Sequence, residues 1–186
     1  MINPCSVKGI SIFLELARRN PDRHFAAVPT WGTTAGDRST LAACPNVRLL
    51  EPTPDLDALF APMEVLLVPS LWQEGYGRSV LEAMARGVPV LAADVGGLPE
   101  AKLGVDHLVP VEPIVHWRRG LSPSLEPRLD PVVLEQNVDP WQQALDAVLA
   151  DPRRTLAERS RAAARRFLDG QDLDGLERLL QGLGGR

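Results

Sequence analysis

The sequence predicts an α/β fold, namely a Rossmann-like parallel sheet with helices on both faces. Helical and strand-like patterns alternate from the first residues of the chain. Two short runs, 65–68 and 90–93, are entirely apolar, which is typical of parallel strands that are buried on both faces. With 186 residues, of which 45% are hydrophobic, the chain can bury the core of one ordinary domain.

The first part of the predicted sheet can be followed in order along the chain. Apolar residues at helical spacing predict a helix from Ile10 to about Asn20. A strand is expected over 24–28 and another over 47–50, with a loop rich in Thr and Gly over 29–39 between them. Strands and helices that alternate in this way build parallel sheets.

Short helices accompany the two apolar strands. A helix over 56–60, with Asp55 as its N-cap, precedes the first of these strands. A helix from Arg78 to Arg86 separates the two strands, and Gly87 and Pro89 end it.

The alternation of strands and helices stops after residue 111. We interpret the chain as a single domain, 1–186, in three parts: a core over 1–111, a Pro-rich excursion with little periodicity over 112–140, and C-terminal helices over 141–186. Apolar spacing in the last part predicts one helix from Trp141, one over 156–168 and one over 173–183.

The composition argues against several classes of protein. A formal charge of −4 does not suit a nucleic-acid binder, which needs a dominant basic face. Two cysteines, Cys5 and Cys44, cannot make a disulfide framework, and their scarcity fits a reducing compartment. The sequence shows neither an apolar run long enough for a membrane helix nor a signal peptide, so we expect a cytoplasmic location.

The segment from Val68 to Val90 carries the chemistry. It predicts a strand, a loop with two glycines, a helix, a tight stop and a second strand. Gly75 and Gly77 allow a ligand to approach the backbone closely, because they have no Cβ. The helix that follows offers free N–H groups and the positive end of its dipole, so this loop is suited to a diphosphate.

Two glutamates accompany this anion site. Glu74 lies in the loop itself, at the carboxyl end of a parallel strand, where ligands bind in such sheets. Glu82 lies in the helix among apolar residues, and a carboxylate there could accept hydrogen bonds from both hydroxyls of a ribose. The two glutamates alone would be weak evidence for a nucleotide site.

Together with its neighbours, the segment resembles the C-terminal nucleotide-sugar-binding domain of GT-B fold glycosyltransferases, specifically the large family 4 (group 1). The shared elements are a Pro-Ser strand end, the two spaced glutamates, a helix that ends in Gly-x-Pro-Val, and a Gly-Gly-x-x-Glu turn at Gly96–Glu100. Near the N-terminus, Lys8-Gly9 resembles the family's Lys-Gly pair. The resemblance covers about 2–111 and continues weakly into the C-terminal helices.

The resemblance implies the donor-binding half of a retaining glycosyltransferase that uses a nucleoside-diphosphate sugar and no metal ion. Glu74 would be the catalytic residue and hold hydroxyls of the transferred sugar, Glu82 would hold the ribose, and Lys8 would neutralise the diphosphate. The other implied donor contacts surround the start of the helix: Gly75, Tyr76, Gly77, Arg78, Ser79 and Val80.

The chain departs from the family pattern in two positions and in length. The family often has Phe where this chain has Tyr76, and often has Arg where it has Asn3; Arg78 could supply the missing phosphate-binding cation. GT-B enzymes have two similar domains, with the acceptor site largely on the N-terminal one. We expect that this acceptor domain is absent from the chain and would act with it in cis or in trans.

Other interpretations stay open beside this one. The chain could be a non-catalytic nucleotide-binding or partner-interaction module that retains the fold, or a relative of the GT-B nucleotide-sugar epimerases. The Asp-Leu-Asp motifs at 55–57 and 172–174 each open a helical pattern, so we expect caps there and no metal site. The basic stretch 153–166 suits a contact with a partner domain, or less often with an anionic membrane surface.

Overall fold

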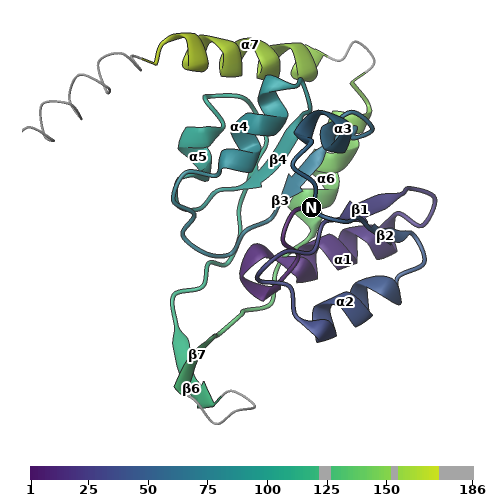
Figure 1. Ribbon diagram of the computed structural model, residues 1–186, viewed down its shortest axis with the longest axis vertical. Helices are drawn as coiled ribbons and strands as arrows, with labels where there is room; N and C mark the ends of the chain where they lie inside the picture. Colours follow the sequence, from purple (N-terminus) through teal and green to yellow (C-terminus); the bar gives the residue numbers. More distant parts are fainter. Residues whose placement is uncertain (122–126, 152–154, 172–186) are drawn as a thin grey trace, which may run out of the picture.

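Parallel strands form the centre of the molecule (Figure 1). The structure, a computed structural model, describes residues 1–121, 127–151 and 155–171. Its parallel strands hydrogen-bond in two groups: β1 (Phe25–Ala27) with β2 (Val47–Leu49), and β3 (Leu66–Val68) with β4 (Val90–Ala93) and β5 (Leu108–Val109). The predicted α/β class with parallel strands is therefore confirmed.

The first residues of the chain extend the first group of strands. Ile2 forms a parallel bridge with Val28, just beyond the end of β1. The backbone N–H of Asn3 donates to the Val28 carbonyl at 2.9 Å, and that of Val28 donates to the Met1 carbonyl at 3.0 Å. The loop after residue 3 therefore begins at the same edge of the sheet as the loop after β1.

Helices enclose the strands. All four residues of β4 are buried, because α4, α5 and α6 all contact this strand. One 3-10 helix and seven α-helices lie in the described residues: η1 (Ser6–Lys8), α1 (Ile10–Arg19), α2 (Ala35–Ala42), α3 (Leu56–Phe60), α4 (Arg78–Ala85), α5 (Leu98–Ala101), α6 (Asp139–Leu149) and α7 (Thr155–Asp169). Five of these helices begin within two residues of the predicted positions, and α3 begins and ends as predicted, whereas η1 and α5 were not predicted.

The predicted loop over 29–39 is wrong at its end, because α2 begins at Ala35. The Thr34 side chain accepts a hydrogen bond from the Asp37 backbone N–H at 3.1 Å, and the Asp37 carboxylate accepts one from the Thr34 N–H at 2.9 Å. This reciprocal capping box begins a helix in which only Leu41 is buried. A helix with so little apolar surface shows no apolar periodicity in its sequence.

The Pro-rich stretch 112–140 contains an antiparallel hairpin that was not predicted. β6 (Trp117–Leu121) pairs with β7 (Pro127–Pro131), and the hairpin projects away from the body of the domain (Figure 1). Its base is fixed to the core, where the Ile114 N–H donates to the Leu71 carbonyl at 2.6 Å. The predicted helix over 173–183 and the motif at 172–174 lie outside the described residues.

Candidate functional site

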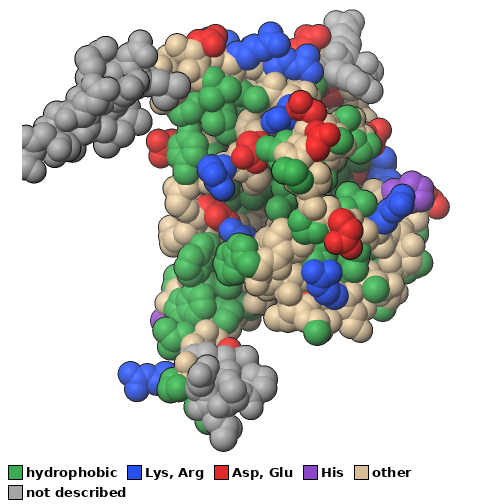
Figure 2. Space-filling view, viewed as in Figure 1, with side chains coloured by type: hydrophobic (Ala, Val, Ile, Leu, Met, Phe, Trp, Pro, Cys, Tyr) green, Lys and Arg blue, Asp and Glu red, His purple; other side chains and the backbone are tan. Residues whose placement is uncertain are grey.

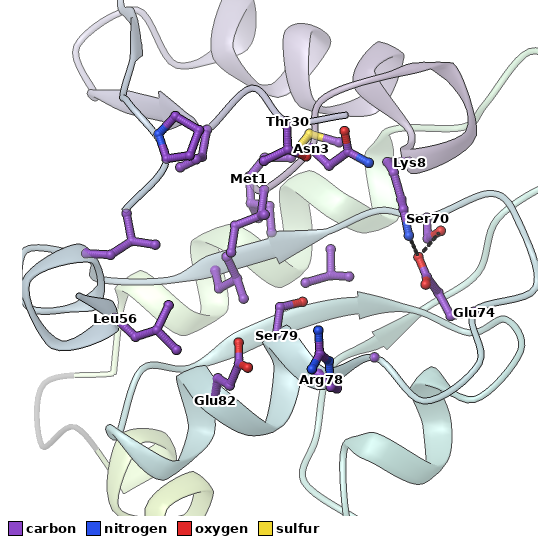
Figure 3. A pocket seen from close by; sticks show the side chains of 18 of the residues that line it. Met1, Asn3, Lys8, Thr30, Leu56, Ser70, Glu74, Arg78, Ser79 and Glu82 are labelled. Carbon is purple, nitrogen blue, oxygen red and sulfur yellow. Dashed lines mark hydrogen bonds and ion pairs between the residues drawn. The ribbon is translucent and has the colours of Figure 1, made fainter. Parts of the chain in front are cut away.

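A cavity of about 680 Å³ opens at the carboxyl edge of the strands, between the loops that follow residue 3 and β1 on one side and α4 on the other (Figure 3). Its volume lies in the range of small-molecule sites. The cavity brings together seven of the predicted site residues: Lys8, Glu74, Tyr76, Gly77, Arg78, Ser79 and Glu82. Gly75 and Val80, which were also predicted, are not among the residues that line it.

The best-defined contact in the cavity joins Lys8 to Glu74. The lysine ammonium forms an ion pair with Glu74 Oε1, and Ser70 Oγ donates to the same oxygen at 2.8 Å (Figure 3). The side chains of Lys8 and Glu74 are only 21% and 14% exposed. A paired, hydrogen-bonded carboxylate at this depth has a fixed orientation, and a ligand can replace either partner only by offering matching charge or hydrogen bonds.

Close backbone packing positions Lys8. Gly9, directly after it, has a φ of 74°, and a Cβ at this residue would lie 1.9 Å from the Pro69 carbonyl oxygen. The N–H of Leu71 donates to the Val7 carbonyl at 3.0 Å. The lysine loop is thus fixed to the end of β3, immediately before the loop that carries Glu74. Any residue other than glycine at position 9 would push the two loops apart.

A second glycine contact positions Glu74. The N–H of Gly97 donates to the Glu74 carbonyl at 2.8 Å. A Cβ on Gly97 would lie 2.1 Å from the Gly75 carbonyl oxygen, and one on Gly96 would lie 2.5 Å from the Glu74 nitrogen. From the sequence this glycine pair could be simply a turn; in the structure it holds the backbone of the glutamate loop.

The start of α4 forms the floor of the cavity. Gly77 is its N-cap, with a φ of 71° and no side-chain cap. The Val80 N–H donates to the Gly77 carbonyl at 2.8 Å, and the Val80 side chain is fully buried in the core. Val80 therefore supports the helix start from within, whereas Arg78, Ser79 and Glu82 line the cavity.

Asn3, at the position where the family often has Arg, has a structural role. It is buried, has a φ of 55°, and its Oδ1 accepts a hydrogen bond from the Gly32 N–H at 3.0 Å. Asn3 thereby fixes the turn after β1, which carries Trp31 into the lining of the cavity. Neither residue was predicted as part of the site; an isolated Trp in a Thr- and Gly-rich loop was the one available signal.

A family profile described as "Glycosyl transferases group 1" matches residues 2–116. The match extends over more than half of the chain and includes every residue that lines the cavity except Met1. The chain belongs to the group 1 glycosyltransferases.

Curated relatives share parts of this group 1 sequence. D-inositol 3-phosphate glycosyltransferase from Corynebacterium aurimucosum is 37% identical over an alignment of 98 residues, gaps included, and the match covers 47% of this chain and 23% of the relative. The enzyme of the same name from Mycobacterium avium is 37% identical over 111 residues, which are 60% of this chain and 21% of the relative. The chain thus matches less than a quarter of the length of these two relatives.

Solved structures show the same fold. Sucrose-phosphate synthase from Thermosynechococcus elongatus superposes with a TM-score of 0.68 at 21% identity, over 95% of this chain and 43% of that one. Anabaena HepE in complex with UDP superposes with a TM-score of 0.64 at 21% identity, over 88% of this chain and 42% of that one. This group 1 chain therefore has the fold of one part of the GT-B glycosyltransferases.

Tyr76 of the glycosyltransferase chain connects the cavity to the last described helix. Its ring lies 6.1 Å from that of Phe167 in α7, centroid to centroid. The hydroxyl is buried and has no hydrogen-bond partner among the described residues. Desolvation raises the pKa of Tyr76, and the Glu100 carboxylate adds to the shift. The phenol therefore stays neutral and is available as a hydrogen-bond donor.

Two other polar motifs of this group 1 chain make contacts within the domain. Asp55 caps α3, since its Oδ1 accepts from the Ala58 N–H at 2.9 Å, as predicted. In α7, Arg159 pairs with Asp106 at 2.6 Å and Arg161 donates to the Arg86 carbonyl at 3.0 Å, so these two cations contact the domain itself. In the part of the chain that the structure describes, no three His, Cys, Asp or Glu side chains are grouped as a metal site requires, and no helix is both long and apolar enough to cross a membrane.

Proposed function

We propose that this chain is the donor-binding half of a retaining glycosyltransferase that transfers a sugar from a nucleoside-diphosphate sugar. The observation that carries the proposal is the position of Lys8, Glu74 and Glu82 in one cavity, beside the start of α4. These are the charged groups that such a donor needs: a cation for the diphosphate and carboxylates for the hydroxyls of its two sugars. The acceptor would bind between this domain and a second one, present in cis or in trans.

The diphosphate would bind between Lys8 and the first turn of α4. Backbone N–H groups at a helix start and a lysine ammonium both stabilise negative charge, which grows on the leaving nucleotide as the glycosidic bond breaks. The pair with Glu74 holds Lys8 at the cavity wall before the donor arrives. Because Lys8 and the helix supply the positive charge, we propose that transfer needs no metal ion.

The two glutamates would hold the two sugars. Glu74, oriented by Ser70 and Lys8, would accept hydrogen bonds from the transferred sugar, and Glu82 from the ribose hydroxyls. Gly77, Arg78 and Ser79 would contact the diphosphate, with Gly75, Tyr76 and Val80 supporting the loop and helix start around them. In this arrangement the reacting carbon of the donor lies near Glu74, and the protein restricts its orientation.

Calorimetry with UDP, GDP and ADP tests the proposal. Glu82→Ala should weaken binding by roughly 1.5–3 kcal/mol, because it removes a charge-assisted contact to the ribose. Glu100→Ala is the matched control, since Glu100 is an exposed glutamate outside the cavity lining. Equal affinities of the two folded variants would contradict the ribose role of Glu82.

A second titration tests Lys8. Lys8→Ala should lower the affinity for a nucleoside diphosphate and leave the affinity for the free nucleoside unchanged. It should also reduce the salt dependence of diphosphate binding. Turnover requires the complementary acceptor domain, so we expect none from this chain alone. Sustained transfer by the purified chain would contradict the half-enzyme proposal, and binding without turnover in the presence of the complementary domain would favour a non-catalytic module.

A further inference from the structure

One aromatic side chain in the cavity has no role in the contacts described so far. Trp31 follows β1, lines the cavity, and is 87% exposed, more than any other large apolar side chain in the described residues. An exposed indole lacks the favourable free energy that burial of its apolar surface would give. The position is therefore unfavourable in the free protein and becomes favourable once a flat apolar group covers the ring.

The turn that carries Trp31 is fixed by several hydrogen bonds. The Thr33 N–H donates to the Thr30 carbonyl at 3.1 Å, and the Thr30 N–H donates to Thr33 Oγ1 at 3.2 Å. The buried Asn3 binds the Gly32 N–H from below, and a Cβ on Gly32 would lie 2.9 Å from the Asn3 side-chain nitrogen. The turn is thus rigid although its Trp31 side chain is exposed, which lowers the entropy lost when a ligand orders the indole.

The turn lies across the cavity from the proposed ribose site. Figure 3 shows Thr30, the neighbour of Trp31, on the wall that faces Ser79 and Glu82. The same view places Lys8 and Glu74 at one end of the cavity and Leu56 at the other, with Glu82 between them. If the diphosphate of the donor lies at Lys8 and its ribose at Glu82, the base lies further from Lys8 than the ribose does. The charged residues of the lining are Lys8, Glu74, Arg78 and Glu82, and Figure 3 shows none of them between Glu82 and Leu56.

We infer that Trp31 is the surface on which the nucleobase of the donor stacks. This inference rests on the proposed function and adds the recognition of the base to it. A nucleobase is flat and has polar atoms only at its edge, so its face needs an aromatic surface, and an indole provides the largest one among protein side chains. Stacking tolerates every base, so Trp31 supplies affinity, and the identity of the base is chosen by other contacts.

Titration of the 186-residue chain with UDP, GDP, ADP and inorganic pyrophosphate tests the inference. Trp31→Ala should weaken the best-bound nucleoside diphosphate roughly 5- to 150-fold, the range that loss of one base–aromatic stack gives. Trp31→Phe should recover most of the affinity, because a phenyl ring still stacks. Binding of pyrophosphate, which has no base, should be the same in all of these proteins.

Trp117→Ala is the matched control, since it also removes an exposed indole, 39% accessible, but from the hairpin outside the cavity. It should bind every ligand as the wild type does. Native affinity of Trp31→Ala for the nucleoside diphosphate would overturn the stacking role and leave the proposed function intact. If Trp31→Ala weakened pyrophosphate binding as much as nucleoside-diphosphate binding, the stacking role would be overturned too, because Trp31 would then act through the shape of its loop. Failure of the wild-type chain to bind any of the nucleoside diphosphates would overturn the proposed function and this inference together.

Discussion

The glutamate loop, 69–77, and the β6–β7 hairpin both extend from the sheet, but they are held in different ways. The loop is fixed by backbone contacts that leave no room for a Cβ on Gly9 or Gly97. The hairpin is held mainly by its own strand pairing and by its base at Ile114. The cavity therefore depends on close approach of main chains, and we expect that the hairpin can change without altering the cavity.

The two strands of the hairpin place their apolar residues on one face. Cross-strand partners share a face of an antiparallel pair, and here three such pairs share it: Trp117 with Pro131, Arg119 with Leu129, and Leu121 with Pro127. Leu121 and Leu129 are 60% and 63% exposed, and apolar side chains cover much of this region in Figure 2. Trp72, from the glutamate loop, meets Trp117 edge to face at 5.8 Å between centroids. This ring contact connects the two regions.

Gly97→Ala should show the largest effect, because it places a Cβ 2.1 Å from the Gly75 carbonyl oxygen. Both atoms belong to the main chain, so no side chain can rotate away, and the loop must move. We expect a loss of about 3 kcal/mol in the free energy of unfolding, typical of severe overpacking, together with weaker binding of a nucleoside diphosphate. Urea unfolding and calorimetry measure the two effects.

Gly75→Ala is the control for this substitution. A Cβ on Gly75 would meet nothing within 4 Å, and its φ is not positive, so the free energy of unfolding should stay within about 0.5 kcal/mol. Equal stability of the Gly97→Ala and Gly75→Ala proteins would show that backbone contact does not hold the glutamate loop.

The pH dependence of the free energy of unfolding should reveal the lowered pKa of Lys102, which is the buried one of the two lysines. Lys102 is fully buried, donates to the Val90 carbonyl at 2.5 Å, and burial lowers its pKa to about 8. Because the unfolded chain binds more protons between pH 8 and 10.5, this lysine makes the free energy of unfolding rise with pH in that window. The full change is roughly 3 kcal/mol.

Comparison with Lys102→Met isolates this contribution. Burial raises the pKa values of Cys5 and Tyr76, but these groups titrate in both proteins, so they cancel in the difference. Urea unfolding between pH 7 and 10 should show a steeper rise for the wild type than for the variant. Parallel pH profiles would mean that Lys102 is solvated in the folded protein.

Local patterns in the sequence predicted those parts of the fold that depend on local forces. The apolar runs at β3 and β4 require burial on both faces, and the Asp55 cap begins α3, so both were predicted closely. By contrast, α2 depends on its Thr34 cap more than on apolar spacing, and its beginning was placed in a loop. The hairpin was not predicted because β6 is almost entirely exposed and Leu129 of β7 is 63% exposed, and an exposed strand needs no apolar alternation.

In the site, too, local sequence indicated individual residues, whereas the contacts between distant residues appear only in the structure. Lys8 and Glu74 were predicted individually, through resemblance to the family, but their ion pair joins residues 66 positions apart and follows only from the packing of Gly9 on Pro69. The contribution of Asn3 is similarly remote, since it fixes a turn 29 residues further along. Sequence patterns therefore predicted the charged groups of the cavity, but the contacts that position them required the structure.

Tyr76→Phe should change the free energy of unfolding less than Gly97→Ala does, and in the opposite direction. The Tyr76 hydroxyl is buried without a partner among the described residues, so its removal should stabilise the free chain by about 1 kcal/mol. Thermal unfolding without ligand measures this change. A decrease in stability would mean that the hydroxyl does have a partner in solution. Weaker nucleotide binding by Tyr76→Phe would show that this hydroxyl contacts the bound nucleotide.

Shortening the hairpin should have the smallest effect on the cavity. The Val132 N–H donates to the His116 carbonyl at 3.0 Å. A two-residue turn is closed by a hydrogen bond of this kind, so Asn-Gly can replace 117–131 without moving His116 and Val132. The Trp72 ring loses its partner, an edge-to-face contact worth about 1 kcal/mol, while Ile114 keeps its bond to Leu71. We expect the free energy of unfolding to fall by no more than about that amount and nucleoside-diphosphate affinity to stay native. Loss of nucleotide binding in a shortened protein that still unfolds cooperatively would show that the hairpin, through Trp72, shapes the glutamate loop after all.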